Sequence, residues 1–197
     1  MKTVSPVFEA NLQTYLDQLK KIPLDAVIER LGGRNATLPF LGNPHAISPG
    51  GIVDAKGRRA RYEVCIVLFR HLIMCPPEIP QEREWVSFKD LKGAGPLTVY
   101  FRDNAEAPLI QAFGDDPKAL KAAAKALGGS PPDLDLQYDV ALVVQALPKI
   151  PLLLLFNGAD GEFPAECSIL FERRVESFID PECIAILGHC LAQGLMA

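Results

Sequence analysis

The sequence predicts a single α+β domain, with helices at its N-terminus, short antiparallel strands in the middle, and a C-terminal β-meander closed by a helix. Three observations support this. Apolar residues recur at helical spacing near both ends, glycine and proline separate short apolar pieces from 35 to 56, and strand-like segments fill about 138–171. Of the 197 residues, 49% are hydrophobic, which suffices for a substantial core, so we expect one domain over 1–197.

Two helices are expected at the beginning of the chain. Ser5 can cap the first helix and Pro6 suits its first helical position. Pro23 interrupts the apolar stripe, which resumes over 24–31 and ends at two glycines. The two helices should therefore form a bent pair.

The segment 35–56 is expected to form short strands and turns, and a basic patch follows it. The patch could bind a phosphate or a carboxylate, although solvated charges on a loop are the preferred interpretation. Its members surround Gly57 and are Lys56, Arg58, Arg59 and Arg61.

The apolar segment 62–75 is expected to be a buried helix, since it is long for a strand and stops at two prolines. His71 lies within it, and a histidine in such a setting can bind a cofactor or transfer protons. We keep His71 as a candidate ligand-binding residue. A structural role is the simpler interpretation, because no partner lies at helical spacing.

The middle of the chain is expected to contain a short helical turn and a weak strand. Ser87 and Asp90 form a capping-box-like pair after Trp85, which should anchor the turn to the core. Residues 97–101 include β-branched and aromatic residues, and this short segment could be a strand or the entry to a helix, of which a weak strand is the preferred interpretation. Helices with N-caps follow, and these are 105–113 after Asn104, 117–127 after Asp116, and a closing helix after Asp180.

The predicted meander consists of three strands. Residues 138–145 alternate between apolar and polar and should be half-buried, whereas 150–156 are apolar throughout and should form a central strand. The third strand, 167–171, follows a glycine-rich acidic turn. The turn therefore connects two neighbouring strands.

The acidic turn is the second candidate site. Asp160 and Glu162, near Glu166, could supply oxygen ligands to a divalent cation or receive a basic partner. A purely structural turn is the preferred interpretation, because the spacing differs from a calcium loop. In that interpretation the glycines have positive φ, Asp160 bonds its own backbone, and Phe163 with Pro164 tucks against the sheet. No metal site is predicted.

The cysteines do not form a metal-binding motif. No C-x-x-C pair occurs, so we interpret all the cysteines as buried thiols. Cys183 and Cys190 would share a helix face with His189 beside them, but packed thiols are preferred to metal ligation there. The cysteines are Cys65, Cys75, Cys167, Cys183 and Cys190.

Composition and missing motifs exclude several classes of function. The 20 Lys and Arg nearly balance the 24 Asp and Glu, so neither a nucleic-acid nor a membrane partner is expected. No signal peptide or bilayer-length apolar segment is evident, which predicts a soluble cytoplasmic protein. P-loop, dinucleotide, serine-hydrolase and zincin motifs are missing, which disfavours an enzyme. A cysteine nucleophile served by His45, His71 or His189 stays open.

Part of the sequence resembles an uncharacterised prokaryotic domain family, the domain of unknown function numbered 3786. The likeness spans about 60–191, and Glu172 departs from it by standing where an aspartate is usual. The acidic turn also has one carboxylate fewer than the family usually carries. The residues that carry the resemblance are Trp85 to Phe88, Leu91, Leu147 to Pro151, Gly158, Asp160, Glu162 to Pro164, Ile169 to Phe171, Asp180 to Glu182 and Leu187.

The resemblance implies a setting for the protein. The family is common in anaerobes, and some members resemble fusions behind a four-cysteine iron–sulfur module like that of corrinoid proteins. This implies a role near corrinoid or low-potential redox chemistry, with an iron–sulfur or corrinoid protein as partner. No cysteine precedes Cys65 in this chain, so we expect any cluster to belong to a separate protein.

Together these features predict an accessory protein that binds a ligand or docks onto a partner. One alternative is an enzyme that joins Asp160 and Glu162 to His71 or His45, and another is a structural interaction module. A deep pocket with convergent polar groups would favour ligand binding, whereas an exposed apolar patch would favour docking. The sequence singles out no cofactor and no oligomeric state.

Overall fold

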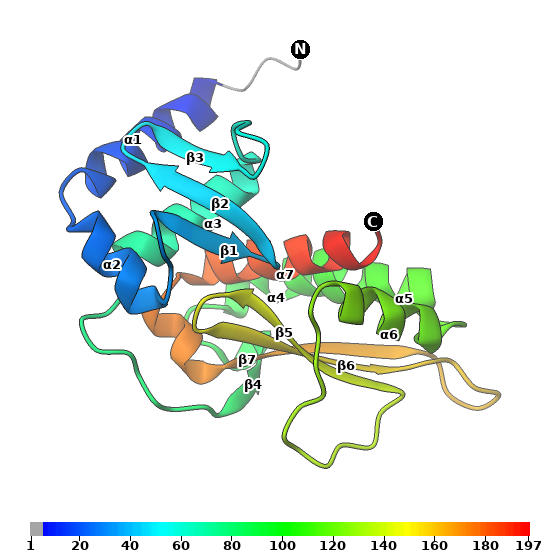
Figure 1. Ribbon diagram of the computed structural model, residues 1–197. Coiled ribbons are helices and arrows are strands. Elements are labelled where there is room, and N and C mark those ends of the chain that lie inside the picture. Colours follow the sequence, from blue (N-terminus) through cyan, green and yellow to red (C-terminus); the bar gives the residue numbers. More distant parts are fainter. Residues whose placement is uncertain (1–5) are drawn as a thin grey trace.

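The computed structural model in Figure 1 describes residues 6–197, with the side chains of 6–9 outside the description. Two antiparallel sheets are surrounded by helices, which confirms the predicted α+β class. Ser5, the expected cap of the first helix, lies outside the described residues. None of the described helices has the length and apolar character needed to cross a bilayer.

The first two helices form as predicted. α1 spans Pro6–Leu19 and α2 spans Leu24–Leu31, with Pro23 between them. Gly32 ends α2 in the left-handed conformation, at φ 91°, and its N–H donates to the carbonyl of Glu29 over 2.8 Å. Glycine is favoured there because it adopts a positive φ without steric cost.

The predicted short strands form a small sheet of order β1-β2-β3. The chain after β3 folds back and closes its outer edge, because Asp54 N–H donates to Arg58 and Ala60 N–H donates to Ile52. An edge covered in this way cannot pair with another strand. The strands are β1 (Thr37–Phe40), β2 (Asn43–Ser48) and β3 (Gly51–Asp54).

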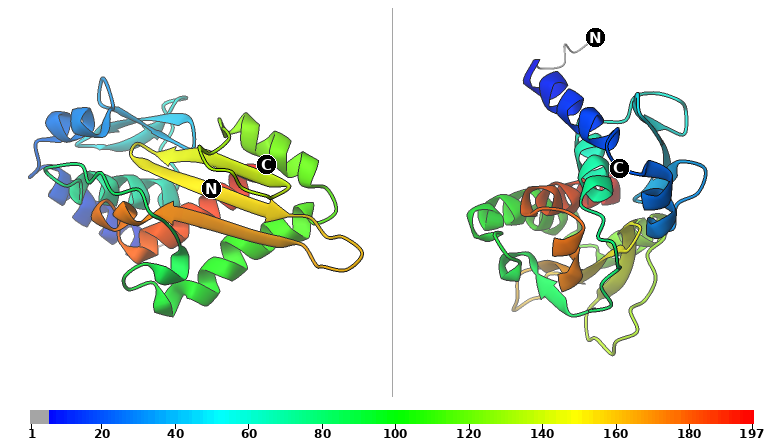
Figure 2. Two further views of the ribbon diagram at one scale, coloured as in Figure 1. Left: turned by 90° about the horizontal axis from the view of Figure 1, so that it is seen from below. Right: turned by 90° about the vertical axis from the view of Figure 1, so that its left-hand side faces the viewer.

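The predicted meander forms most of a large sheet of order β4-β7-β6-β5. β6 lies between two strands and is buried on both faces, as its continuous apolar sequence predicts. Helices α5 and α7 lie over one face of this sheet (Figure 2). The strands are β4 (Trp85–Ser87), β5 (Val140–Leu147), β6 (Ile150–Asn157) and β7 (Glu166–Glu172).

The remaining helices include the predicted ones and confirm two of the predicted caps. Asp116 accepts from the N–H of Ala119 over 3.0 Å, and Asp180 accepts from the N–H of Cys183 over 2.9 Å. α3 is largely buried, as expected, and packs against α1 and α7. These helices are α3 (Tyr62–Ile73), α5 (Ala107–Phe113), α6 (Pro117–Ala126) and α7 (Pro181–Leu195), with the short turn η4 (Arg173–Ser177) before α7.

Two expectations for the middle of the chain are wrong. Residues 97–101 are helical, because Phe101 is buried beneath α7 and stacks on Phe88 with ring centroids 4.4 Å apart. Asn104 is not a cap but lies inside a π-helical turn. Packing outweighs β-propensity in this segment. The elements are η2 (Gly95–Leu97), α4 (Thr98–Phe101) and the π-turn η3 (Arg102–Glu106).

Trp85 to Ser87 also departs from the prediction, because it forms the edge strand β4 and pairs with the end of β7. The helical turn η1, Phe88–Asp90, follows it. Ser87 donates its hydroxyl proton to the carboxylate of Asp90 and does not cap the turn. A strand of three residues is too short to show alternation in the sequence.

Gly188 is expected to be essential to the packing of α7. A Cβ atom at Gly188 would lie 2.3 Å from Cε2 of Phe101. The Phe101 ring cannot move aside, because it is buried in an aromatic stack. We expect Gly188→Ala to lower the free energy of unfolding by about 1–3 kcal/mol, the usual cost of overpacking, despite the helix propensity of alanine.

Gly194→Ala is the matched control in the same helix. A Cβ atom there would lie 3.3 Å from Cδ1 of Leu127, the far end of a flexible side chain. This variant should keep the stability of the wild type or gain up to about 1 kcal/mol. Urea unfolding of both variants checks the prediction, and equal stabilities would contradict it.

Candidate functional site

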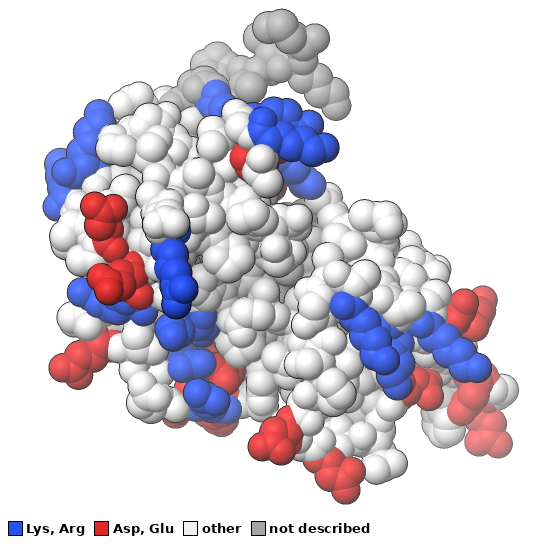
Figure 3. All heavy atoms as spheres, viewed as in Figure 1, with Lys and Arg blue, Asp and Glu red and all other residues white. Residues whose placement is uncertain are grey.

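A cleft of about 680 Å³ lies between the small sheet, the start of α3 and the end of α7. This volume is typical of small-molecule sites. Its lining combines apolar residues such as Phe40, Leu41 and Val64 with many basic side chains. Lys and Arg gather over the loop after β3 (Figure 3). The charged lining side chains are Lys56, Arg58, Arg59, Arg61 and the single carboxylate Asp54.

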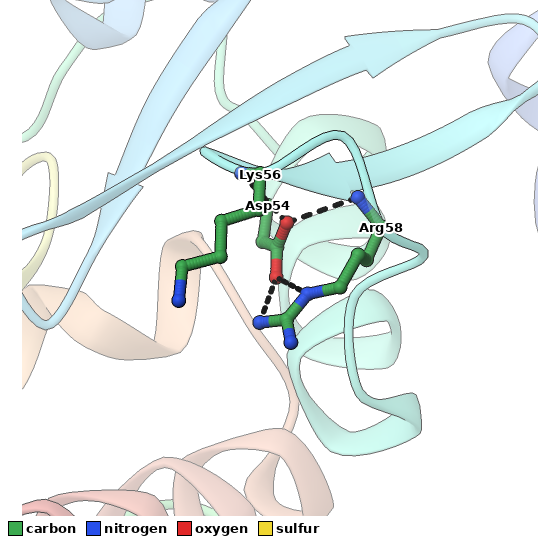
Figure 4. Close-up of polar contacts among 3 residues, drawn as sticks. All are labelled: Asp54, Lys56 and Arg58. Atoms are coloured by element: carbon green, nitrogen blue, oxygen red, sulfur yellow. Dashed lines mark hydrogen bonds and ion pairs between the residues drawn. The ribbon is translucent and has the colours of Figure 1, made fainter.

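Asp54 organises the loop between β3 and α3. Its carboxylate accepts from the backbone N–H groups of Lys56 and Arg58 over 2.8 and 3.0 Å, and from Arg58 Nη2 over 2.7 Å (Figure 4). The Arg58 guanidinium and these N–H groups lower the pKa of Asp54 to about 2. Gly57, at φ 71°, permits the tight return of the chain.

The ammonium group of Lys56 is exposed and can contact a ligand in the cleft. The side chain of Lys56 extends away from Asp54 (Figure 4). None of the described side chains and carbonyls accepts from its ammonium group, which is exposed at the cleft. A lysine ammonium held beside an apolar cleft can bind a phosphate or carboxylate.

A chain of hydrogen bonds orients Arg61 at the other side of the cleft. Arg61 Nη2 donates to Gln193 Oε1 over 2.7 Å, and Gln193 Nε2 lies 2.8 Å from His189 Nε2. His189 Nδ1 lies 3.0 Å from the carbonyl oxygen of Asn104. The carbonyl only accepts, so Nδ1 of His189 carries the proton and Nε2 accepts from Gln193. All three side chains therefore have a defined orientation.

His45 lies on β2 and lines the same cleft. Only 7% of its surface is exposed, and its ring packs edge-on against Phe40 with centroids 6.2 Å apart. Nδ1 lies 2.9 Å from the carbonyl oxygen of Asn43. The cleft thus combines cationic groups with one buried imidazole.

His71, a candidate from the sequence, lies outside this cleft. It is fully buried on α3, and its ring is 5.6 Å from that of Phe178. Neither ring nitrogen makes a hydrogen bond of good geometry with the described residues, and the carbonyl of Pro148 is only a weak partner for the ring. Burial lowers the pKa of His71 to about 3, and the carbonyl of Pro148 opposes this only partly.

Asp160 and Glu162 lie on the acidic turn before β7 and Glu166 is the first residue of β7, whereas Phe178, beside His71, follows that strand. The length of that strand separates the two groups, so the structure does not bring them together. Asp160, Glu162 and Glu166 are exposed. Asp160 accepts from the backbone N–H groups of Glu162 and Phe163, which lower its pKa. This self-bonded turn has the form expected of the structural interpretation.

Two details of the predicted acidic turn are wrong. Gly158 and Gly161 do not have positive φ. Glycine is needed at 158 because a Cβ atom would lie 2.5 Å from Cγ of Pro117. Phe163 does not tuck against the sheet but is 67% exposed, since the turn extends beyond the strands.

The cysteines are free thiols and are only partly as expected. Cys65, Cys183 and Cys190 are buried, whereas Cys75 and Cys167 are half-buried. Burial raises the pKa of Cys65 and Cys190 to about 11, so both stay protonated at neutral pH. The described histidine, cysteine, aspartate and glutamate side chains include no group arranged to hold a metal ion.

The sequence pointed to part of the cleft and missed the rest. The basic patch around Gly57 is visible in the sequence and forms one wall. Gln193 was missed, although its spacing of four residues from His189 on a predicted helix is a usable signal. The sequence indicated His45 only as a possible enzyme histidine, and nothing there placed it beside the basic patch or Gln193.

Comparisons with known proteins give one match. The model of the family described as Domain of unknown function (DUF3786) matches residues 18–194. The matched region is longer at both ends than the resemblance over about 60–191 that was expected from the sequence. No curated protein and no solved structure matches the chain.

Proposed function

We propose, on the premise that the chain belongs to the DUF3786 family, that it is a binding protein for a small anionic ligand held in the basic cleft. The observation that carries the proposal is the lining, where four cationic side chains accompany one carboxylate around a partly apolar hollow. Arg58 already neutralises that carboxylate, and Arg61 also lies 3.6 Å from the carboxylate of Glu63, outside the lining. The cleft therefore has an excess of positive charge, which attracts a phosphate or carboxylate.

Pre-organisation supports the same proposal. The hydrogen bonds that Asp54 accepts from backbone N–H groups fix the shape of the loop that carries Lys56. A hydrogen bond to Gln193 orients Arg61. Side chains and loops ordered before binding lose less conformational entropy when the ligand arrives. The apolar residues beside them suit the carbon skeleton of a small organic anion.

Partner docking has less support in the structure. Among the described residues, the large apolar side chains that are strongly exposed come from several segments that are distant in sequence. Scattered apolar residues are normal on a protein surface. They are Val99, Tyr100, Leu134, Tyr138, Phe163 and Met196.

Lys56→Ala is expected to weaken binding of n-propyl phosphate about tenfold, because one charge-assisted hydrogen bond is lost. Lys118→Ala is the matched control, since Lys118 is exposed on α6 and does not line the cleft. Chemical-shift titration of labelled protein measures both affinities and should show shifts around the loop after β3. A wild type with no saturable shifts in the cleft would refute the proposal.

We extend the proposal to the setting that the family resemblance implies, in which the protein serves an iron–sulfur or corrinoid partner. The direct test is to add a corrinoid to protein purified without oxygen and to follow its absorbance bands. A saturable band shift that Lys56→Ala weakens would support a corrinoid ligand in the cleft. An unchanged spectrum would argue for a different small anion.

A further inference from the structure

We propose that His45 is a ligand-binding residue whose neutral imidazole accepts a hydrogen bond from a hydroxyl group, so that the cleft selects hydroxylated small anions. The inference rests on the proposed function, because the anionic part of the ligand is held by the basic side chains of the same cleft.

Strand register directs His45 into the cleft. Residue pairing places His45 on β2 opposite Asp54 on β3. Directly paired residues of antiparallel strands project from the same face of the sheet. The imidazole and the carboxylate of Asp54 therefore share the face that lines the cleft, beside the loop that carries Lys56.

The contact with Asn43 determines what the imidazole can do. Nδ1 is 2.9 Å from a carbonyl oxygen, which only accepts, so Nδ1 carries the proton of the neutral ring. Nε2 is then an acceptor. No residue in the described part of the chain hydrogen-bonds to Nε2. The unpaired buried side-chain atoms are those of His71, so Nε2 of His45 must reach solvent through the cleft.

A nearly buried acceptor without a partner favours a ligand that supplies a donor. A ligand that fills the cleft displaces water from Nε2, and this costs binding free energy unless the ligand supplies a donor in its place. The charged side chains of the lining supply no free acceptor, because Lys56 and Arg61 only donate and Asp54 is occupied by the loop. A matching ligand has an anionic group for the cations and a hydroxyl for His45, as in a sugar phosphate.

The test compares two probes with the same phosphate and the same three-carbon chain. Glycerol 3-phosphate carries hydroxyl groups and n-propyl phosphate carries none. Wild type should bind the hydroxylated probe about threefold to tenfold more tightly, as one neutral hydrogen bond allows. His45→Phe should bind both probes equally, with the affinity of the wild type for n-propyl phosphate. Chemical-shift titration measures all four affinities.

A second measurement does not depend on the folding of the variant. The ¹⁵N resonance of His45 Nε2 in wild type should shift on saturation with glycerol 3-phosphate and stay nearly constant with n-propyl phosphate. Equal affinity of wild type for the two probes would overturn the role of His45 and leave the anion cleft intact. If His45→Phe weakened the binding of both probes equally, the role of His45 would also be overturned, because His45 would then contact the phosphate and not the hydroxyl group. Failure of both probes to bind would refute the proposed function itself.

Discussion

Replacing His71 by leucine is expected to remove much of the acid sensitivity of the folded protein between pH 6.5 and 3. Burial lowers the pKa of His71 from 6.5 to about 3 in the folded chain. In this window the unfolded chain binds a proton that the folded chain does not, so wild-type stability falls as the pH falls. Over the full window the loss from this residue reaches about 5 kcal/mol at most.

Urea unfolding at a series of pH values tests this expectation. The free energy of unfolding of wild type should fall relative to that of His71→Leu by about 1.4 kcal/mol for each pH unit between 6.5 and 3. At pH 7 the variant should be close to wild type, because leucine removes two buried ring nitrogens that make no hydrogen bond of good geometry with the described residues. Leu68→Met, a buried control on α3, should shift the curve without changing its shape. If the free energy of unfolding depended on pH in the same way for His71→Leu and for wild type, the prediction would be wrong.

Arg174→Met is expected to lower the free energy of unfolding by about 3–5 kcal/mol, because it leaves a buried carboxylate without its cation. Arg174 Nε donates to Glu172 over 2.6 Å, and Nη1 donates to the carbonyl of Pro80 over 3.0 Å. The side chains of the pair are only 8% and 7% exposed. Water therefore cannot replace the lost partner.

The double variant Arg174→Met with Glu172→Leu should recover most of that stability, since no unpaired buried charge is left. Arg102→Met is the matched control, because its pair with Asp103 is 63% and 52% exposed and should contribute less than about 1 kcal/mol. Chemical denaturation of these variants gives the comparison. If the double variant were no more stable than Arg174→Met, the interpretation would be wrong.

The candidate site shows where sequence reasoning reaches its limit. The basic residues around Gly57 are adjacent in sequence, so their patch was visible. Their role depends on what faces them, and the facing residues His45 and Gln193 lie on β2 and α7. Their meeting depends on the register between β2 and β3 and on how α7 packs against α3. The hairpin register is set within 43–54, but the packing of α7 against α3 joins segments that are far apart in the sequence.

The sequence by itself determined the elements whose signals are local. Asp116 and Asp180 cap helices through their own nearby backbone, and Pro23 with Gly32 delimits α2 through allowed dihedral angles. The apolar run of β6 also identified a central strand, because such a run must be buried on both faces.

Only the tertiary structure decided the segments whose local preferences are weak or opposed. Residues 97–101 have strand-forming composition but become helical, since burial of Phe101 against Phe88 and α7 outweighs a propensity worth about 1 kcal/mol or less. β4 exists because β7 offers it backbone partners. The cleft likewise requires long-range packing, which brings distant side chains together through contacts that no periodic pattern records.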